Sequence, residues 1–181
     1  MLHREENMGR RNARRLALAS IALAACVVNL SFDMEQPGLV LQSPAAMSVS
    51  QTSLVDLGSN PDVRAHQKDI DSLNLEYLDV NITDIKSDNA ASQLSLTVAL
   101  RKGVSDPPEN DVLVGNIPSF PVVPNATTRI PGNPALDAFL LDRLHDGGKF
   151  YLVVSGTTNG KTDLVLDVNL HASMAYDTGL F

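Results

Sequence analysis

Apolar and polar residues alternate along most of the chain from about residue 46 onward. The clearest case is the segment 93–101, where every second residue is apolar and one face of a strand would enter a core. Residues 164–171 have the same period, whereas 150–155 are apolar on both faces, as in a central strand. The Asn159-Gly160 pair between these two segments predicts a hairpin turn.

Two further segments carry signals of their own. In residues 70–83 the alternation changes phase once, at Tyr77-Leu78, which predicts a β-bulge or two consecutive strands. Asn133 and Pro134 form a helix-start signal, and Gly147-Gly148 a stop signal, so we expect one short helix near 134–146. The proline-rich residues 115–134 predict a surface excursion or a sheet edge, because proline cannot donate to a sheet ladder.

Together these elements predict an all-β fold, an antiparallel β-sandwich of the Ig-like or jelly-roll-like two-sheet type with one short helix. Strands and helices do not alternate regularly, which argues against a doubly wound α/β fold. We expect the sandwich domain to span 46–181. Residues 26–45 contain serine, proline and glycine and predict a tether, with one early strand at 39–42.

Charge divides the chain of 181 residues into two unequal parts. Residues 1–25 hold five arginines against two glutamates, a charge of +3, whereas 26–181 hold nine basic and nineteen acidic residues, a charge of −10. Ten apolar or small residues, 16–25, follow the basic head. A membrane span needs about 20 apolar residues, so this pattern predicts a targeting signal, beginning at Met1 or Met8, rather than a permanent anchor helix.

The apolar run ends in Leu23-Ala24-Ala25-Cys26, which resembles the lipobox of bacterial lipoproteins. The resemblance implies that 1–25 is a lipoprotein signal peptide, that the chain is cut before Cys26, and that Cys26 carries the acyl chains, such as palmitate, that anchor the protein. Family members kept in the inner membrane tend to have Asp after the cysteine, so Val27 implies the outer membrane of a Gram-negative bacterium. The alternative is an ordinary secretory signal with an unrelated cysteine behind it.

Motifs for catalysis or nucleic-acid binding are absent from the sequence. There is no G-x-S-x-G, H-E-x-x-H, P-loop or G-x-G-x-x-G motif, and His66, His145 and His171 are far apart along the chain. Cys26 is the only cysteine, and because it belongs to the lipobox it is not a candidate nucleophile. The acidic body does not favour binding to a phosphate backbone. We therefore expect a protein that is not an enzyme and does not bind nucleic acid.

Acidic loops are the one candidate for metal chemistry. Calcium takes six to eight oxygen ligands, and carboxylates gather in two stretches of the sequence. We expect no cofactor by default, but if a calcium site exists its ligands would be Asp69, Asp71, Asp106, Glu109 and Asp111.

These observations predict a lipid-anchored cell-envelope lipoprotein whose β-sandwich is a non-enzymatic structural, adhesion or binding module. Its partners would be the membrane, through lipidated Cys26, and an envelope protein or surface ligand that contacts the proline-rich and acidic loops. Two alternatives remain open. The five carboxylates could serve a calcium-dependent ligand binder or an envelope hydrolase, or the space between the sheets could carry an apolar ligand.

Overall fold

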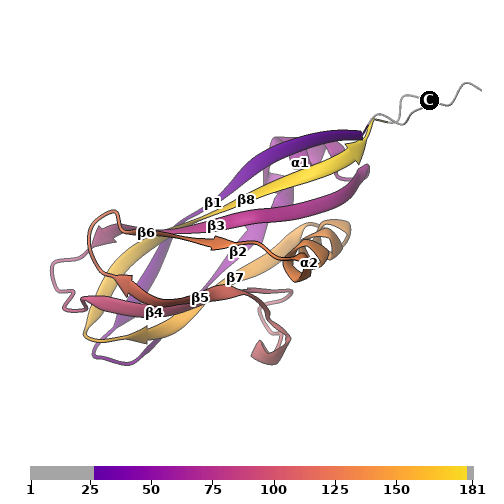
Figure 1. Cartoon of the computed structure of the whole chain (residues 1–181). Coiled ribbons are helices and arrows are strands. Elements are labelled where there is room, and N and C mark those ends of the chain that lie inside the picture. Colours follow the sequence, from indigo (N-terminus) through magenta and orange to yellow (C-terminus); the bar gives the residue numbers. More distant parts are fainter. Residues whose placement is uncertain (1–26, 179–181) are drawn as a thin grey trace, which may run out of the picture.

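The computed structural model describes residues 27–178, which fold into two four-stranded antiparallel sheets packed face to face (Figure 1). The all-β sandwich predicted from the sequence is therefore confirmed. The elements are β1 (Val27–Ser43), β2 (Ser48–Asp56), the 3-10 turn η1 (Leu57–Ser59), α1 (Pro61–His66), β3 (Ile70–Ile85), β4 (Gln93–Arg101), the 3-10 turn η2 (Pro108–Asn110), β5 (Val112–Pro121), β6 (Thr127–Pro131), α2 (Pro134–His145), β7 (Lys149–Thr158) and β8 (Thr162–Asp177).

The strand order identifies the type of sandwich. One sheet, called sheet A, has the order β1-β8-β3-β6, and the other, sheet B, has the order β2-β7-β4-β5. The chain crosses between the sheets after β1, β2 and β3, and again after β5, β6 and β7. Eight strands divided equally in this order make a jelly roll rather than an Ig-like sandwich, whose seven or nine strands divide unequally.

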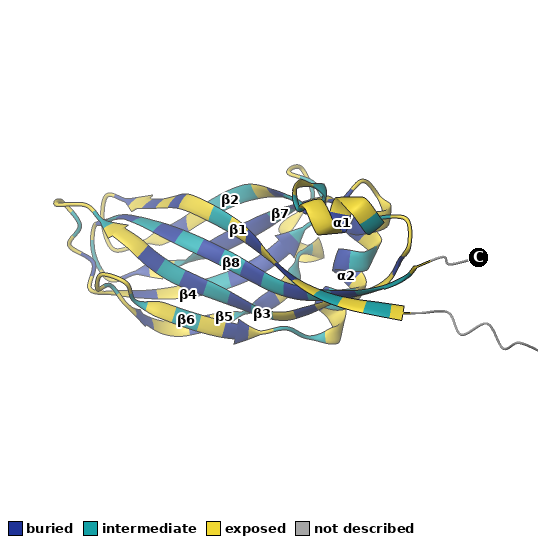
Figure 2. Ribbon diagram, turned by 90° about the horizontal axis from the view of Figure 1, so that it is seen from above, coloured by how far each residue is buried: buried dark blue, intermediate teal, exposed yellow. Residues whose placement is uncertain are grey.

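Alternating apolar side chains from both sheets fill the space between them. Buried and exposed residues accordingly alternate along the strands (Figure 2). Along β8 every second residue from Thr162 to Met174 is buried, and the inner residues of β4 and β7 meet them from sheet B. Phe139 of α2 packs edge-on against Phe150 of β7, with ring centroids 5.8 Å apart. The helix therefore closes one end of the core, and this packing leaves the outer faces of the two sheets for contact with other molecules.

The residues predicted as a tether, 26–45, contain the whole of the longest strand. β1 runs from Val27 to Ser43 and pairs with β8 along its length, from Val27–Asp177 to Ser43–Thr162. A bulge between Gln36 and Leu39 shifts the register. Before the bulge the even-numbered residues face the core, and after it the odd-numbered ones do. Because the bulge changes the phase at Pro37-Gly38, the alternation on either side is easily mistaken for an irregular spacer.

Several local predictions are confirmed. The helix near 134–146 is α2, whose first turn is capped by the Asn133 side chain. The Asn-Gly turn joins β7 to β8, and the proline-rich segment supplies most of β5 and all of β6, which are one edge strand of each sheet. The structure adds one helix that the sequence analysis did not predict. This is α1, whose N-cap is Asn60.

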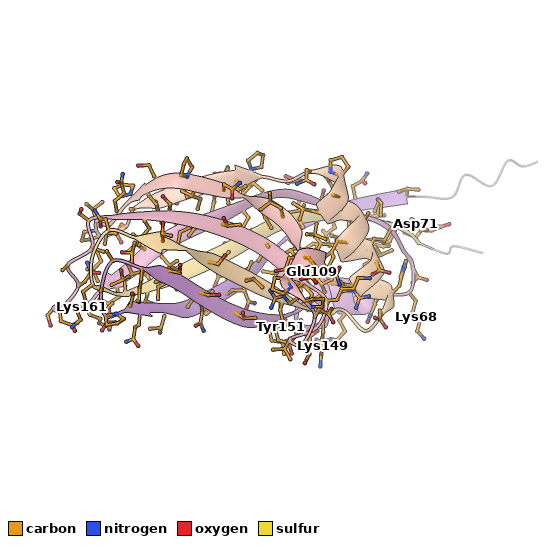
Figure 3. The ribbon with its side chains drawn as sticks, turned by 90° about the horizontal axis from the view of Figure 1, so that it is seen from below. Lys68, Asp71, Glu109, Lys149, Tyr151 and Lys161 are labelled. Carbon is orange, nitrogen blue, oxygen red and sulfur yellow. The ribbon has the colours of Figure 1, made fainter. Side chains whose placement is uncertain are left out.

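β1 begins and β8 ends at the same end of the sandwich, beside α1 (Figure 2). Because the predicted acylation site, Cys26, directly precedes β1 in the sequence, we call this the anchor end and define it by Val27, His66, Lys68, Asp71 and Tyr176. The opposite, far end carries the turns between β1 and β2, between β3 and β4, and between β7 and β8, and Lys161 marks it in Figure 3.

Candidate functional site

Cys26, the predicted acylation site, lies outside the described residues. Its neighbour Val27 is the first residue of β1, with 56% of its surface exposed. Between 27 and 178 no helix has the length and apolar character needed to cross a bilayer.

The five carboxylates proposed as calcium ligands are not brought together. Asp69 and Asp71 lie at the start of β3 in sheet A, whereas Asp106, Glu109 and Asp111 lie in the β4–β5 connection of sheet B. Figure 3 shows Asp71 and Glu109 well apart. Among residues 27–178, no group of three or more His, Cys, Asp or Glu side chains is arranged to hold a metal ion.

Two of these carboxylates have structural partners instead. Asp111 accepts two hydrogen bonds of 2.7 Å from Arg101, and this pairing raises the pKa of the arginine. Asp106 accepts a 2.9 Å hydrogen bond from the backbone N–H of Gly103 and so closes the turn after β4. Their oxygens are thus used to shape the β4–β5 connection.

The outer face of sheet A carries a row of paired polar and aromatic side chains that crosses all four strands. We call it the His171 row, and its members are Asp33, Glu76, Tyr77, Asp79, Arg129 and His171. His171 Nδ1 lies 2.8 Å from Asp33 Oδ1, and its Nε2 lies 3.5 Å from Glu76 Oε2. The imidazole therefore contacts a carboxylate on each side.

Tyr77 connects the two halves of this row. Its ring stacks on the imidazole of His171, with centroids 4.6 Å apart, and the guanidinium of Arg129 lies 3.5 Å from the centre of the same ring. Arg129 also donates two hydrogen bonds of 2.7 and 2.8 Å to Asp79, and this pairing raises the pKa of the arginine. A cation over an aromatic face and a bidentate carboxylate pair hold β6, the short edge strand, against β3.

A β-bulge explains how two adjacent residues of β3 both reach this row. The register of β3 with β8 shifts between Leu75 and Tyr77, so Glu76 and Tyr77 both face outward beside His171. The phase change predicted at Tyr77-Leu78 thus exists one residue earlier. The period of two in residues 164–171 agrees with the outward position of His171, but the sequence analysis missed Asp33, because residues 27–38 were interpreted as a spacer.

A depression of about 180 Å³ adjoins the row, and it is lined by Glu35, Pro37, Asn81, Asp167, Val168 and Asn169. Asn169 donates to Asp33 through Nδ2 at 3.3 Å, while its Oδ1 atom is buried with no hydrogen-bond partner. The outer face of sheet A therefore presents acceptors, a guanidinium and an imidazole in one fixed arrangement, which suits a polar or charged ligand.

The outer face of sheet B differs in its chemistry. Its middle and far part presents hydroxyl and amide side chains and no charge, with members Ser48, Ser50, Ser95, Thr97, Asn116, Ser155 and Thr157; we call this the neutral face. Thr97 Oγ1 donates to Asn116 Oδ1 at 2.8 Å. Toward α1, Leu54 and Leu113 are each 49% exposed.

Comparison with known proteins shows similarity only to distant solved structures. No family model matches the sequence, and no curated protein does. The chain is similar to a structure of Desmodium yellow mottle tymovirus, with 10% identity over 84% of this chain and 89% of that one and a TM-score of 0.39. It is also similar to the decameric BFDV capsid protein, with 7% identity over 82% of this chain and 99% of that one and a TM-score of 0.44.

A third similar structure is the semi-empty virus-like particle of a nodavirus of the giant freshwater prawn Macrobrachium rosenbergii. Its identity is 8%, the coverage is 98% of this chain and 95% of that one, and the TM-score is 0.41. Similarity at this level says nothing about what the present chain binds or builds.

Proposed function

We propose that this chain is a lipid-anchored protein of the cell envelope whose β-sandwich is a non-enzymatic binding module. One observation carries the proposal. A basic head, ten apolar or small residues and Leu23-Ala24-Ala25-Cys26 come directly before the first strand. All described strands and helices follow Cys26, so cleavage before that residue would leave the sandwich whole. Val27, rather than Asp, behind the cysteine supports the outer membrane as its location.

Two or three acyl chains on Cys26 would hold the domain stably, since each buried CH₂ contributes about 0.8 kcal/mol. The module would then meet its ligand, an envelope protein or a surface molecule, through the His171 row. That row supports the proposal because its side chains are already fixed by one another across four strands, so binding orders few of them.

Mass spectrometry of the membrane fraction tests the anchor, with wild type and Cys26→Ala compared side by side. We expect a wild-type N-terminal peptide that begins at Cys26 and carries acyl mass, because the chain has no other cysteine to take a thioether. We expect Cys26→Ala to lose that mass and leave the membrane fraction. A native protein that starts at Met1 or Met8 with a free thiol would contradict the proposal.

The ligand-binding part of the proposal has a separate test. Co-purification from the same membrane fraction should recover an envelope partner with wild type and lose it with Arg129→Gln. Ser155→Ala, on the neutral face, is the matched control and should retain the partner. Loss of the partner in the control but not in Arg129→Gln would assign binding to sheet B instead.

A second candidate function is favoured by one combination of features. A jelly-roll domain behind an arginine-rich segment also suits a subunit of a self-assembled shell that holds nucleic acid, since jelly rolls occur in capsids. The apolar residues 16–25 and the charge of −10 on the rest of the chain favour the anchored protein. Large particles with absorbance at 260 nm, together with an uncleaved N-terminus, would favour the shell.

A further inference from the structure

The position of β1 leaves no spacer between the acylation site and the folded domain. Val27 follows Cys26 directly, so their Cα atoms are about 3.8 Å apart. We propose that the anchor end of the sandwich rests on the lipid headgroups and that the domain stands upright on the bilayer. This inference depends on the proposed function, because it requires acyl chains on Cys26.

Strand pairing prevents Val27 from acting as a flexible link. It pairs with Asp177 of β8, and the backbone N–H of Asp177 donates to the Asp69 carbonyl at 3.2 Å. Tyr176, the preceding residue of β8, stacks on His66 of α1 with ring centroids 3.8 Å apart. The start of β1 is therefore fixed to β8, to the start of β3 and to α1, and the bilayer must lie against this assembly.

Side chains at the anchor end suit a shallow contact with headgroups. Val27 is 56% exposed, and Lys68 projects from the same end (Figure 3). Valine can reach the acyl boundary, and a lysine stem can lie along it with its ammonium in water. Asp69 and Asp71 are exposed as well and keep their hydration, so this end lies at the headgroups rather than within the hydrocarbon.

The chemistry of the two outer faces favours an upright domain over one that lies flat on the bilayer. On sheet A the carboxylates of Asp33, Glu35 and Glu76 would lose water against lipid. If the neutral face of sheet B lay on the bilayer, Val27, which belongs to sheet A, would be lifted by about 10 Å, the spacing of packed sheets. With 17 residues in β1, the far end of an upright domain lies roughly 50 Å from the membrane.

Single-tryptophan fluorescence tests this orientation, because the chain has no tryptophan of its own. Val27→Trp, Val123→Trp and Leu113→Trp place the probe at the anchor end, at the far end and on sheet B. The three native side chains are matched in exposure, at 56%, 51% and 49%. Lipidated protein is reconstituted in phosphatidylcholine vesicles with or without a phosphatidylcholine that carries a doxyl quencher at carbon 5.

We expect the quencher to lower the emission of Val27→Trp about twofold, as for an interfacial indole, and to leave the other two variants unchanged. Asn29→Trp, the next outward residue on β1, is a second probe of the anchor end and should be quenched less strongly. It also keeps the test decisive if Val27→Trp does not fold. Equal urea midpoints for all variants show that the fold is intact.

Three results would overturn the upright orientation. In the first, Leu113→Trp is quenched as strongly as the anchor-end probe. In the second, Val123→Trp is quenched. In the third, neither anchor-end probe is quenched in protein whose acyl mass is verified. Mass spectrometry of the same sample separates the two proposals. Protein without acyl mass refutes the anchor, whereas acylated protein with unquenched probes refutes only the orientation.

Discussion

The two outer faces of this sandwich have opposite chemistry although they cover the same core. Sheet A carries the His171 row, in which charged groups on neighbouring strands pair with one another. Sheet B carries hydroxyl and amide groups over its middle and far part, and its bidentate pair, Arg101–Asp111, lies at the end nearer α1. The inner faces of the two sheets are alike, since both are buried aliphatic residues with a few aromatics.

This contrast separates what the fold needs from what the surface is free to do. The core requires only alternation, and both sheets supply it. The outer positions are not constrained in that way, so the two faces are free to differ. A charged face interacts with water, salt and polar ligands, whereas a neutral face can approach another neutral surface without electrostatic repulsion from it. The following predictions test the contrast in order of decreasing effect.

Core substitutions should affect the two sheets equally. Leu166 of β8 and Leu152 of β7 are both fully buried in central strands, so Leu166→Ala and Leu152→Ala should each lower the free energy of unfolding by about 3 kcal/mol. Urea unfolding measures this. Ser173→Ala and Ser155→Ala, at outward positions of the same two strands, are the controls and should change the free energy of unfolding by less than about 0.5 kcal/mol. A large effect in only one sheet would mean that the sheets do not share one core.

Gly156 should tolerate no side chain. A Cβ at this position of β7 would overlap the carbonyl oxygen of Ser95 on β4, so Gly156→Ala must push the two strands apart, at about 2 kcal/mol. Gly38 in the β1 bulge has a φ of +76° and open space around it, so Gly38→Ala should cost about 1 kcal/mol, from backbone strain alone. Urea midpoints that rank the two variants in the reverse order would contradict the close approach of β7 and β4.

Salt should distinguish the outer faces. Arg129→Gln removes the pair with Asp79 and the contact with Tyr77, and the stability lost should shrink as sodium chloride rises to 1 M, because the side chain of Arg129 is largely exposed. Thr97→Val, which removes the hydrogen bond to Asn116 on the neutral face, should cost less than about 1 kcal/mol at any salt concentration. The same salt dependence for both variants would remove the proposed distinction.

Lowering the pH should have the smallest effect on stability, and it acts through a carboxylate that lies outside both faces. Hydrogen bonds from Arg143, and then from Lys102, lower the pKa of Asp142 on α2 to about 2. Because the folded pKa is depressed, the stabilisation is fully present above the ordinary value near 3.8 and is lost as the pH falls toward 2. Asp142→Asn should therefore flatten thermal stability between about pH 4 and pH 2. An unchanged pH profile would show that the pairing with Arg143 and Lys102 does not stabilise the fold.

Strands with an uninterrupted period of two were predictable from the sequence, and β4 and β8 are the best examples. β1 was not, because Pro37-Gly38 interrupts an alternation that is regular on both sides. α1 was missed for a related reason. Its six residues are too few to show a helical period, although Asn60 followed by Pro61 is a helix-start signal.

The candidate site was less accessible to sequence analysis than the fold. His171 and Tyr77 are 94 positions apart in the chain, and only the pairing of β3 with β8 brings their rings together. Asp33 joins them through the pairing of β1 with β8. A sequence predicts which residues alternate outward, but it does not give the register between strands. The acidic stretches around Asp69 and Asp106 show the opposite case. Their carboxylates are close together in the sequence but do not converge on one site in the structure.

The pairing of Val27 with Asp177 has a practical consequence for engineering. Because these residues lie side by side, a reporter fused behind β8 would lie at the same end of the sandwich as the start of β1 and, with the proposed anchor, would crowd the lipid surface. An epitope inserted in the Asn159-Gly160 turn would instead be displayed at the far end of the sandwich. The closeness of the two strand ends also makes the domain a natural subject for circular permutation, with new ends opened at that turn.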